Sequence, residues 1–189
     1  MKASAIILTG AILLAQSVFA ADSTEKKLFT IEKSYNSENI LLIHSQVDRD
    51  CRFVSNTNGF LDFYWLMNGT TKKTVNEMIR SKVQERVKFV GIASAHTSFK
   101  IRLNDLTEIQ HDLEDNTLEV SSEINNGKCE TKSIIKLGPS AQYRKLNLKR
   151  TFCEVKTNMV GVPSGCKYLE LQGVDADNGT KLTVRFKGK

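Results

Sequence analysis

Short runs of alternating apolar and polar residues dominate the chain and predict a mainly β protein. Residues 28–35 and 40–44 are two such runs with a polar turn between them, so we expect a hairpin there. Residues 47–59 are polar and are expected to form a loop. Residues 61–67 hold the only tryptophan and the densest group of aromatic side chains. We interpret this segment as a central strand that seeds the core.

One segment, residues 75–86, has the spacing of a helix. Thr74 and Glu77 stand three residues apart, as in a capping box, where both side chains bond free amides at a helix start. The apolar residues that recur at helical spacing are Val75, Met78, Ile79, Val83 and Val87. This pattern predicts an amphipathic helix whose apolar stripe lies on the sheet.

The second half of the chain predicts strands only. They fall at residues 87–92, 98–103, 107–111, 118–124, 129–137, 146–156, 167–172 and 181–186. Tight turns are expected at Asn126-Gly127 and Asn178-Gly179, as at Asn68-Gly69 before the helix. About ten residues per strand with such turns predicts an antiparallel β-sandwich or barrel-like sheet carrying one amphipathic helix. No linker divides residues 21–189, which we interpret as a single domain.

The first twenty residues have the features of a secretory signal peptide. Lys2 precedes an uncharged apolar run at residues 3–15, and Val18 and Ala20 fit the cleavage position. The run is shorter than the ~20 residues that cross a bilayer, and we expect no membrane span elsewhere. The sequence therefore predicts an exported protein, periplasmic or secreted.

The chain is basic, with 27 Lys and Arg residues against 21 Asp and Glu residues. Removing residues 1–20 takes away one charge, that of Lys2, and leaves a net charge of +5. This balance favours weak contact with anionic surfaces such as lipid head groups or wall polymers. Acidic and basic residues are interleaved, and neither this pattern nor export indicates a nucleic-acid partner.

Four cysteines, an even number, predict two disulfides in an oxidising compartment, with three possible connectivities. We favour Cys153–Cys166, because these residues flank a turn-rich segment and could face each other across two strands. Cys51–Cys129 is then the second pair. No CxxC spacing supports a zinc ribbon or thioredoxin-type chemistry.

Several short motifs occur in the order seen in one known family. The similarity lies in residues 28–36 with Asn39-Ile40, in Tyr64-Trp65 and in the capped segment 74–86, and late in the chain in residues 148–152, Pro163 and residues 168–173. In these motifs the chain resembles the exported bacterial family catalogued as domain of unknown function 4833. A Tyr-Gly expected after the helix is replaced by Glu85-Arg86-Val87, and the four cysteines are additions. The resemblance implies one exported domain and no particular activity.

The sequence shows no catalytic or metal-binding motif, and we expect no cofactor. His44, His96 and His111 each stand alone, without the spacing of metal ligands. There is no GxSxG motif. A group of carboxylates sits in a segment that we interpret as a solvated loop: Asp112, Glu114 and Asp115.

Four residues are candidates for ligand binding. On a regular strand Tyr64 and Trp65 point to opposite faces, so one packs in the core and the other could contact a ligand. Arg144 and Arg150 would share a strand face with Leu146 and Leu148, which could hold an anionic amphiphile. The alternative for the arginines is an edge strand guarded by charge.

We therefore expect an exported, non-enzymatic β domain that binds a small amphipathic ligand or a cell-envelope component. The alternatives are a hydrolase whose site is assembled from distant residues and a structural or interaction protein of the envelope. A ligand binder requires an apolar cavity of about 300 Å³ or more. A hydrolase requires histidine, serine and carboxylate groups in one cleft, and an interaction protein requires an exposed apolar patch.

Overall fold

The computed structural model describes residues 23–36, 39–55, 59–74, 89–91, 97–103, 117–137 and 144–187. Three quarters of them lie in strands, which confirms the prediction of a mainly β protein. The elements are β1 (Thr24–Lys33), η1 (Ser34–Asn36), β2 (Asn39–Val47), β3 (Phe53–Val54), β4 (Asp62–Met67), β5 (Thr71–Thr74), β6 (Phe89–Gly91), β7 (Ser98–Arg102), β8 (Thr117–Asn125), β9 (Lys128–Leu137), β10 (Arg144–Thr157), β11 (Pro163–Asp175) and β12 (Lys181–Lys187).

Among the described residues the strands form one continuous sheet in the order β5-β4-β2-β1-β10-β9-β8-β7-β6. β11 and β12 branch from β10, and β3 pairs with β2. β1 and β10 run parallel, from Thr30 opposite Arg150 to Lys33 opposite Cys153. The expectation of a purely antiparallel sheet is therefore wrong at this junction. Periodicity defines each strand, but it carries no information on the direction of a partner more than a hundred residues away.

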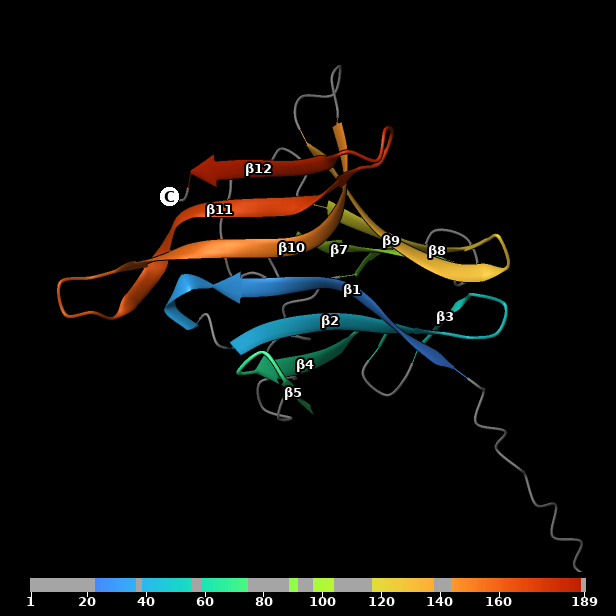
Figure 1. The fold of residues 1–189 in the computed structure, drawn as a ribbon, viewed down its shortest axis with the longest axis horizontal. Helices are drawn as coiled ribbons and strands as arrows, with labels where there is room; N and C mark the ends of the chain where they lie inside the picture. The colour runs from blue at the N-terminus through green and yellow to red at the C-terminus, as the bar shows by residue number, and fades with distance from the viewer. Residues whose placement is uncertain are drawn as a thin grey trace, which may run out of the picture.

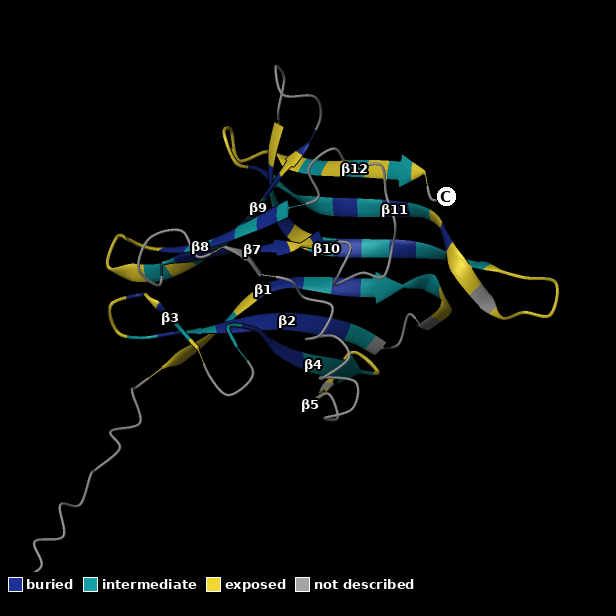
Figure 2. Cartoon of the chain, turned by 180° about the vertical axis from the view of Figure 1, so that it is seen from behind, coloured by how far each residue is buried: buried dark blue, intermediate teal, exposed yellow. Residues whose placement is uncertain are grey.

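The sheet curls into a half-barrel (Figure 1). β1, β2 and β4 form one wall, and β7, β8 and β9 form the wall behind it. β10 is long and bent (Figure 1): it pairs with β11 along residues 146–157, with β9 at residues 144–147 and with β1 at residues 150–153. The core lies between the walls. Buried positions run along the strands of both walls, while the turns that join them are exposed (Figure 2).

Aromatic side chains bring the two walls together. The Phe99 ring from β7 is fully buried and lies 4.9 Å from the Phe53 ring and 5.5 Å from the Phe60 ring, measured between centroids. Phe29 of β1 and Ile43 of β2 are also fully buried. Because burial of each such side chain stabilises the fold by about 2 kcal/mol, these residues are a main reason why the sheet curls.

Both predicted disulfides are present. Cys51–Cys129 joins the loop after β2 to β9 and spans 78 residues, and so links the two walls. Cys153–Cys166 spans 13 residues and joins β10 to β11. Their formation is consistent with an oxidising compartment.

The predicted Asn-Gly turns are also confirmed. Asn68-Gly69 joins β4 to β5, and Asn126-Gly127 joins β8 to β9. All four residues have positive φ, between 50° and 73°. This is the left-handed conformation that such tight hairpin turns require and that Asn and Gly tolerate.

Some boundaries differ from the prediction. β3 lies inside the expected loop, and β5 reaches Thr74, which we had interpreted as a helix cap. Threonines and lysines at 71–74 have little hydrophobic pattern, and they form a strand because β4 offers an open edge. The predicted helix at residues 75–86, the strand at 107–111 and the signal peptide at 1–20 lie outside the described residues.

A bulge in β10 changes which side chains face the core. Its buried positions are Leu146 and Leu148, then Thr151 and Cys153, so the alternation shifts by one residue. The pairing with β11 shifts at the same point, opposite Gly173. A side chain at Gly173 would place its Cβ 2.1 Å from the Asn147 carbonyl oxygen. Only glycine therefore allows the two strands to come this close.

Candidate functional site

Tyr64 and Trp65 lie on opposite faces of β4. Trp65 packs against the core, while Tyr64 faces outward below Lys72, whose Nζ is 3.8 Å from the ring centroid. The Tyr64 ring also meets the imidazole of His44 edge to face, with centroids 5.2 Å apart. Tyr64 is thus part of a polar group on the sheet, which we call the Glu25 cluster (Glu25, His44, Tyr64 and Lys72). A ligand-binding role for either aromatic residue stays a prediction.

The Glu25 cluster is built on three adjacent strands, β1, β2 and β4, with Lys72 from β5. Glu25 Oε1 lies 3.2 Å from Nδ1 of His44, and its Oε2 lies 2.6 Å from Nζ of Lys72. The Tyr64 hydroxyl also donates a hydrogen bond to this carboxylate. His44 itself is 7% exposed. One carboxylate therefore connects a buried imidazole with a surface ammonium group.

These contacts shift both ionisations. Burial lowers the pKa of His44, and the nearby Glu25 only partly offsets this effect. Burial raises the pKa of Glu25, but bonds from Lys72 and Tyr64 and the charge of His44 and Lys72 outweigh it, so the pKa lies below its usual value. Neither ring nitrogen of His44 has a well-aligned hydrogen bond within the described parts of the chain. The cluster thus holds a neutral imidazole beside a carboxylate, without a nucleophile bonded to it.

Arg150 belongs to a ladder of polar side chains across β1, β10, β11 and β12. Its guanidinium forms an ion pair with Glu32 and donates to Gln172 Oε1 at 3.0 Å. Gln172 donates in turn to Glu170 at 2.9 Å, and Nε of Arg185 donates to Glu170 at 2.9 Å. The ladder ties the parallel junction to the last two strands.

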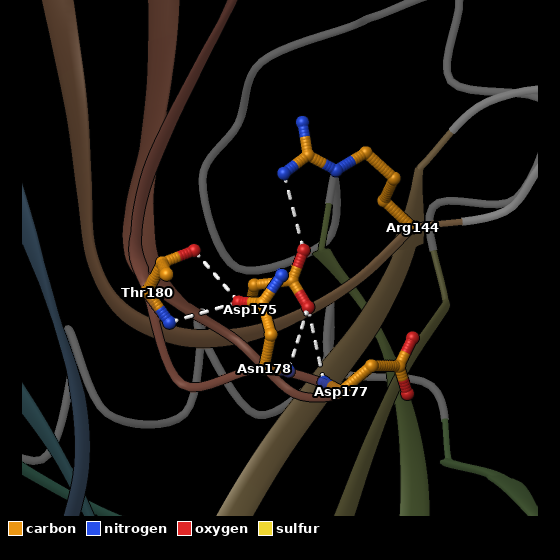
Figure 3. Close-up of polar contacts among 5 residues, drawn as sticks. All are labelled: Arg144, Asp175, Asp177, Asn178 and Thr180. Atoms are coloured by element: carbon orange, nitrogen blue, oxygen red, sulfur yellow. Dashed lines mark hydrogen bonds and ion pairs between the residues drawn. The ribbon is translucent and has the colours of Figure 1, made fainter.

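Arg144 is placed differently. It reaches the turn after β11, where its Nη2 lies 3.1 Å from Oδ2 of the buried Asp175 (Figure 3). The other oxygen of Asp175 accepts from the amides of Asp177 at 3.0 Å and Asn178 at 3.3 Å. The bulge puts Arg150 out of step with Leu146 and Leu148, so the shared Leu and Arg face that strict alternation predicts does not form. The structure does not bring Arg144 and Arg150 together.

A shallow pocket lies over β7, β8 and β9, with a volume of about 30 Å³. It is lined by Lys100, Thr117, Glu119, Ile134 and Lys136. This is room for about one water molecule and a tenth of what a small ligand needs.

Within the described ranges no three His, Cys, Asp or Glu side chains gather as a metal site would require. His96, His111 and the carboxylates of residues 112–115 lie outside these ranges. No described helix is long and apolar enough to pass through a bilayer.

The hairpin between β10 and β11 is the most unusual surface feature. It projects past the ends of β1 and β12 in both views of the molecule, and we call residues 153–166 the arm (Figures 1 and 2). At its tip, residues 158–162, the relative exposure of Met159 is 107%, of Val160 81% and of Val162 53%. Three apolar side chains of one turn therefore lie in solvent, although each is of a type that is usually buried.

The arm is held rigid by its own bonds. Oδ1 of Asn158 accepts from the amides of Val160 at 3.1 Å and Val162 at 2.8 Å. The amide of Asn158 donates to the carbonyl of Val162, and that of Gly161 donates to the carbonyl of Asn158, both at 2.9 Å. Cys153–Cys166 closes the base. These bonds order the backbone of the tip, from which the three apolar side chains project.

Our sequence interpretation missed the arm tip and treated it as a turn-rich loop. A signal was present, because Met159-Val160-Gly161-Val162 is an apolar run between two cysteines where a turn normally has polar residues. Solvent exposure of that run could be seen only once the neighbouring strands were known to end before it.

Fold and site together define a class: a mainly β domain with a curled mixed sheet, two disulfides and an apolar hairpin tip. Comparison with protein-family models, with curated proteins and with solved structures finds no match for the chain. The family resemblance therefore rests on the sequence motifs alone.

Proposed function

We propose that the chain is an exported, non-enzymatic β domain that binds a component of the cell envelope through the arm tip. The observation that carries this proposal is the exposure of Met159, Val160 and Val162 on a rigid, disulfide-closed hairpin. Exposed apolar groups on an already ordered turn favour binding, because less backbone entropy is then lost on contact. The two disulfides support an oxidising, exported setting, and the basic balance of the chain favours contact with anionic surfaces.

The alternatives have less support. A hydrolase could use His44 with Glu25, but neither nitrogen of His44 bonds a serine or cysteine in the described segments. A small amphipathic ligand needs about 300 Å³, and the pocket that the described residues form over β7, β8 and β9 offers about 30 Å³. No observation in the described segments favours either function over surface binding.

Fractionation of a bacterial host that exports the protein tests the proposal. The wild-type protein is expected to sediment with the envelope, and a variant with Met159→Ser, Val160→Ser and Val162→Ser is expected to remain soluble.

Ile124→Ser is the matched control, since Ile124 is 61% exposed beside the turn of the other disulfide-linked hairpin, β8–β9. The control variant should sediment like the wild type. Equal sedimentation of wild type and triple variant, or equal solubility of both, would contradict the proposal.

A further inference from the structure

We infer that the arm tip inserts into the surface of an anionic lipid bilayer. The inference rests on the proposed function, since it names the envelope component that the arm contacts. Four properties of the arm point to lipid rather than protein: the size of its apolar surface, the pairing of its backbone, the charges behind the tip and an aromatic side chain at its base.

The apolar surface is too small for a stable protein interface. Such an interface buries about 800 Å² on each partner, from some 20 to 30 residues. Here Met159, Val160 and Val162 belong to a single five-residue turn that projects away from the sheet. A bilayer accepts a few protruding aliphatic side chains without a matching surface, so the isolated position of the tip suits lipid.

The backbone of the tip is prepared for a medium with little water. An amide that enters the apolar boundary of a membrane without a hydrogen bond is strongly disfavoured. The amides of Asn158, Val160, Gly161 and Val162 all donate to acceptors within the turn. The turn therefore keeps these bonds when water is removed, which a loose loop could not do.

Basic side chains stand behind the tip. The strand ladders place Lys156 near the tip, Lys33 opposite Cys153, and Lys187 opposite Tyr168, with Lys167 beside that tyrosine. The arm itself contains one acidic residue, Glu154, whose Oε1 is 4.0 Å from Nζ of Lys167, and the neighbouring Glu32 and Glu170 form ion pairs with Arg150 and Arg185. The region thus carries a positive excess roughly 10–20 Å behind Met159, at about 3.4 Å per residue. With apolar side chains in the acyl boundary, these lysines would lie at the level of the phosphate groups.

An aromatic residue marks the same level. Tyr35 in η1 is 65% exposed. The amide of Val155 in the arm donates to Oγ of Ser34 at 2.9 Å, which fixes η1 to the base of the arm. Tyrosine favours the boundary between apolar and aqueous phases because its ring is apolar and its hydroxyl is polar. Its position at the base of the arm, two residues after Lys33, agrees with a membrane surface at this height.

Vesicle sedimentation tests the inference with protein purified from a bacterial periplasm, both disulfides formed and the N-terminus established by mass spectrometry. The probes are vesicles of phosphatidylcholine, and of phosphatidylcholine mixed with an equal part of phosphatidylglycerol. We expect binding to the anionic vesicles that weakens with salt. The variant with serine at positions 159, 160 and 162 should bind about tenfold more weakly, and Ile124→Ser should bind like the wild type.

Fluorescence separates insertion from simple charge attraction. Val160→Trp places an indole at the tip, and its emission should shift to the blue on addition of anionic vesicles, while Ile124→Trp should not respond. Lys156→Ser with Lys167→Ser should reduce the preference for anionic over neutral vesicles.

The outcomes distinguish the inference from the proposed function. Loss of vesicle binding in the tip variant, with a blue shift at position 160, supports both. If the tip variant is released from envelopes but the wild type ignores vesicles, the arm binds an envelope protein or polymer, so the lipid inference falls and the proposed function stands. If tip variants change neither envelope nor vesicle binding, both fail.

Discussion

Glu25 and His44 form a pair in which each ionisation depends on the surroundings of both residues. The buried imidazole is kept neutral by loss of solvent, while Glu25 stays ionised through Lys72 and Tyr64. The unfolded chain therefore binds protons more readily at both sites than the folded chain. Lowering the pH should favour unfolding.

The first prediction concerns His44. Because its pKa is lower in the folded than in the unfolded chain, where it is about 6.5, the free energy of unfolding should fall as the pH drops below that value and level off below the folded pKa. In His44→Gln this step should be absent, so its stability should change less between neutral and mildly acidic pH. Urea denaturation at a series of pH values measures the difference.

Lys128→Gln is the control for this prediction, because it removes a charge from an exposed position at the start of β9, outside the Glu25 cluster. It should keep the step seen in the wild type. Parallel stability curves for wild type and His44→Gln would show that the imidazole does not carry the effect.

The sequence alone could not reveal the Glu25 cluster. The register of β1 and β2 shifts at a bulge between Lys27 and Phe29, so counting positions from the turn does not align Glu25 with His44. An isolated histidine was the correct description of His44 in sequence. The β1 bulge places Glu25 beside His44, and β5 supplies Lys72. Neither the bulge nor β5 has a recognisable sequence pattern.

At the scale of elements, local sequence predicted the strands and turns better than it predicted the face of the strand on which each side chain lies. Asn68-Gly69 and Asn126-Gly127 fixed their hairpins because their backbones favour the left-handed conformation. The faces of β10 depend instead on one bulge opposite Gly173. A one-residue shift moves every following side chain to the other face, which is why Arg150 does not share a face with Leu148 as expected.

The turn after β11 provides the second prediction. Asp175 is buried and holds Arg144 and the amides of Asp177 and Asn178, so its pKa is lowered by these bonds (Figure 3). Asp175→Ala leaves those donors without an acceptor and should lower the melting temperature by several degrees.

Asp177→Ala serves as the matched control in the same turn. Its carboxylate is 65% exposed and lies 3.9 Å from Nζ of Lys145, and such surface pairs contribute little. Its melting temperature should stay close to that of the wild type. Equal losses in the two variants would show that the turn does not depend on the buried carboxylate.

At the scale of the whole molecule, the two disulfides constrain the unfolded chain to different extents. Cys51–Cys129 closes a loop six times as long as Cys153–Cys166, with separations of 78 and 13 residues. On the chain-entropy model they contribute about 4.5 and about 3 kcal/mol. The long one also joins the two walls, and the Ser122 hydroxyl donates to the Cys51 carbonyl beside it.

The third prediction follows from this difference. Replacing Cys51 and Cys129 by alanine should lower the free energy of unfolding more than replacing Cys153 and Cys166, as measured by urea denaturation. Each double variant controls for the other, because both remove two buried or half-buried sulfur atoms. The reverse order would mean that closure of the arm matters more than the joining of the walls.

The architecture as a whole was only partly predictable. The strands, turns and cysteine pairs followed from local pattern and from compartment chemistry. The mixed sheet did not, because Thr30 and Arg150 are brought together by the closing of the half-barrel and by no feature of their neighbours in sequence.

The parallel pairing of β1 with β10 constrains the order in which the fold can be completed. The side chains of Glu32 and Arg150, which meet at the β1–β10 junction, are separated by 118 positions. Until β10 is in place, the edge of β1 that pairs with it has unpaired backbone groups, which are open to proteases and to the strands of other chains. β10 lies in the last third of the sequence, so a chain truncated before it would keep the β1 edge unpaired and prone to aggregation.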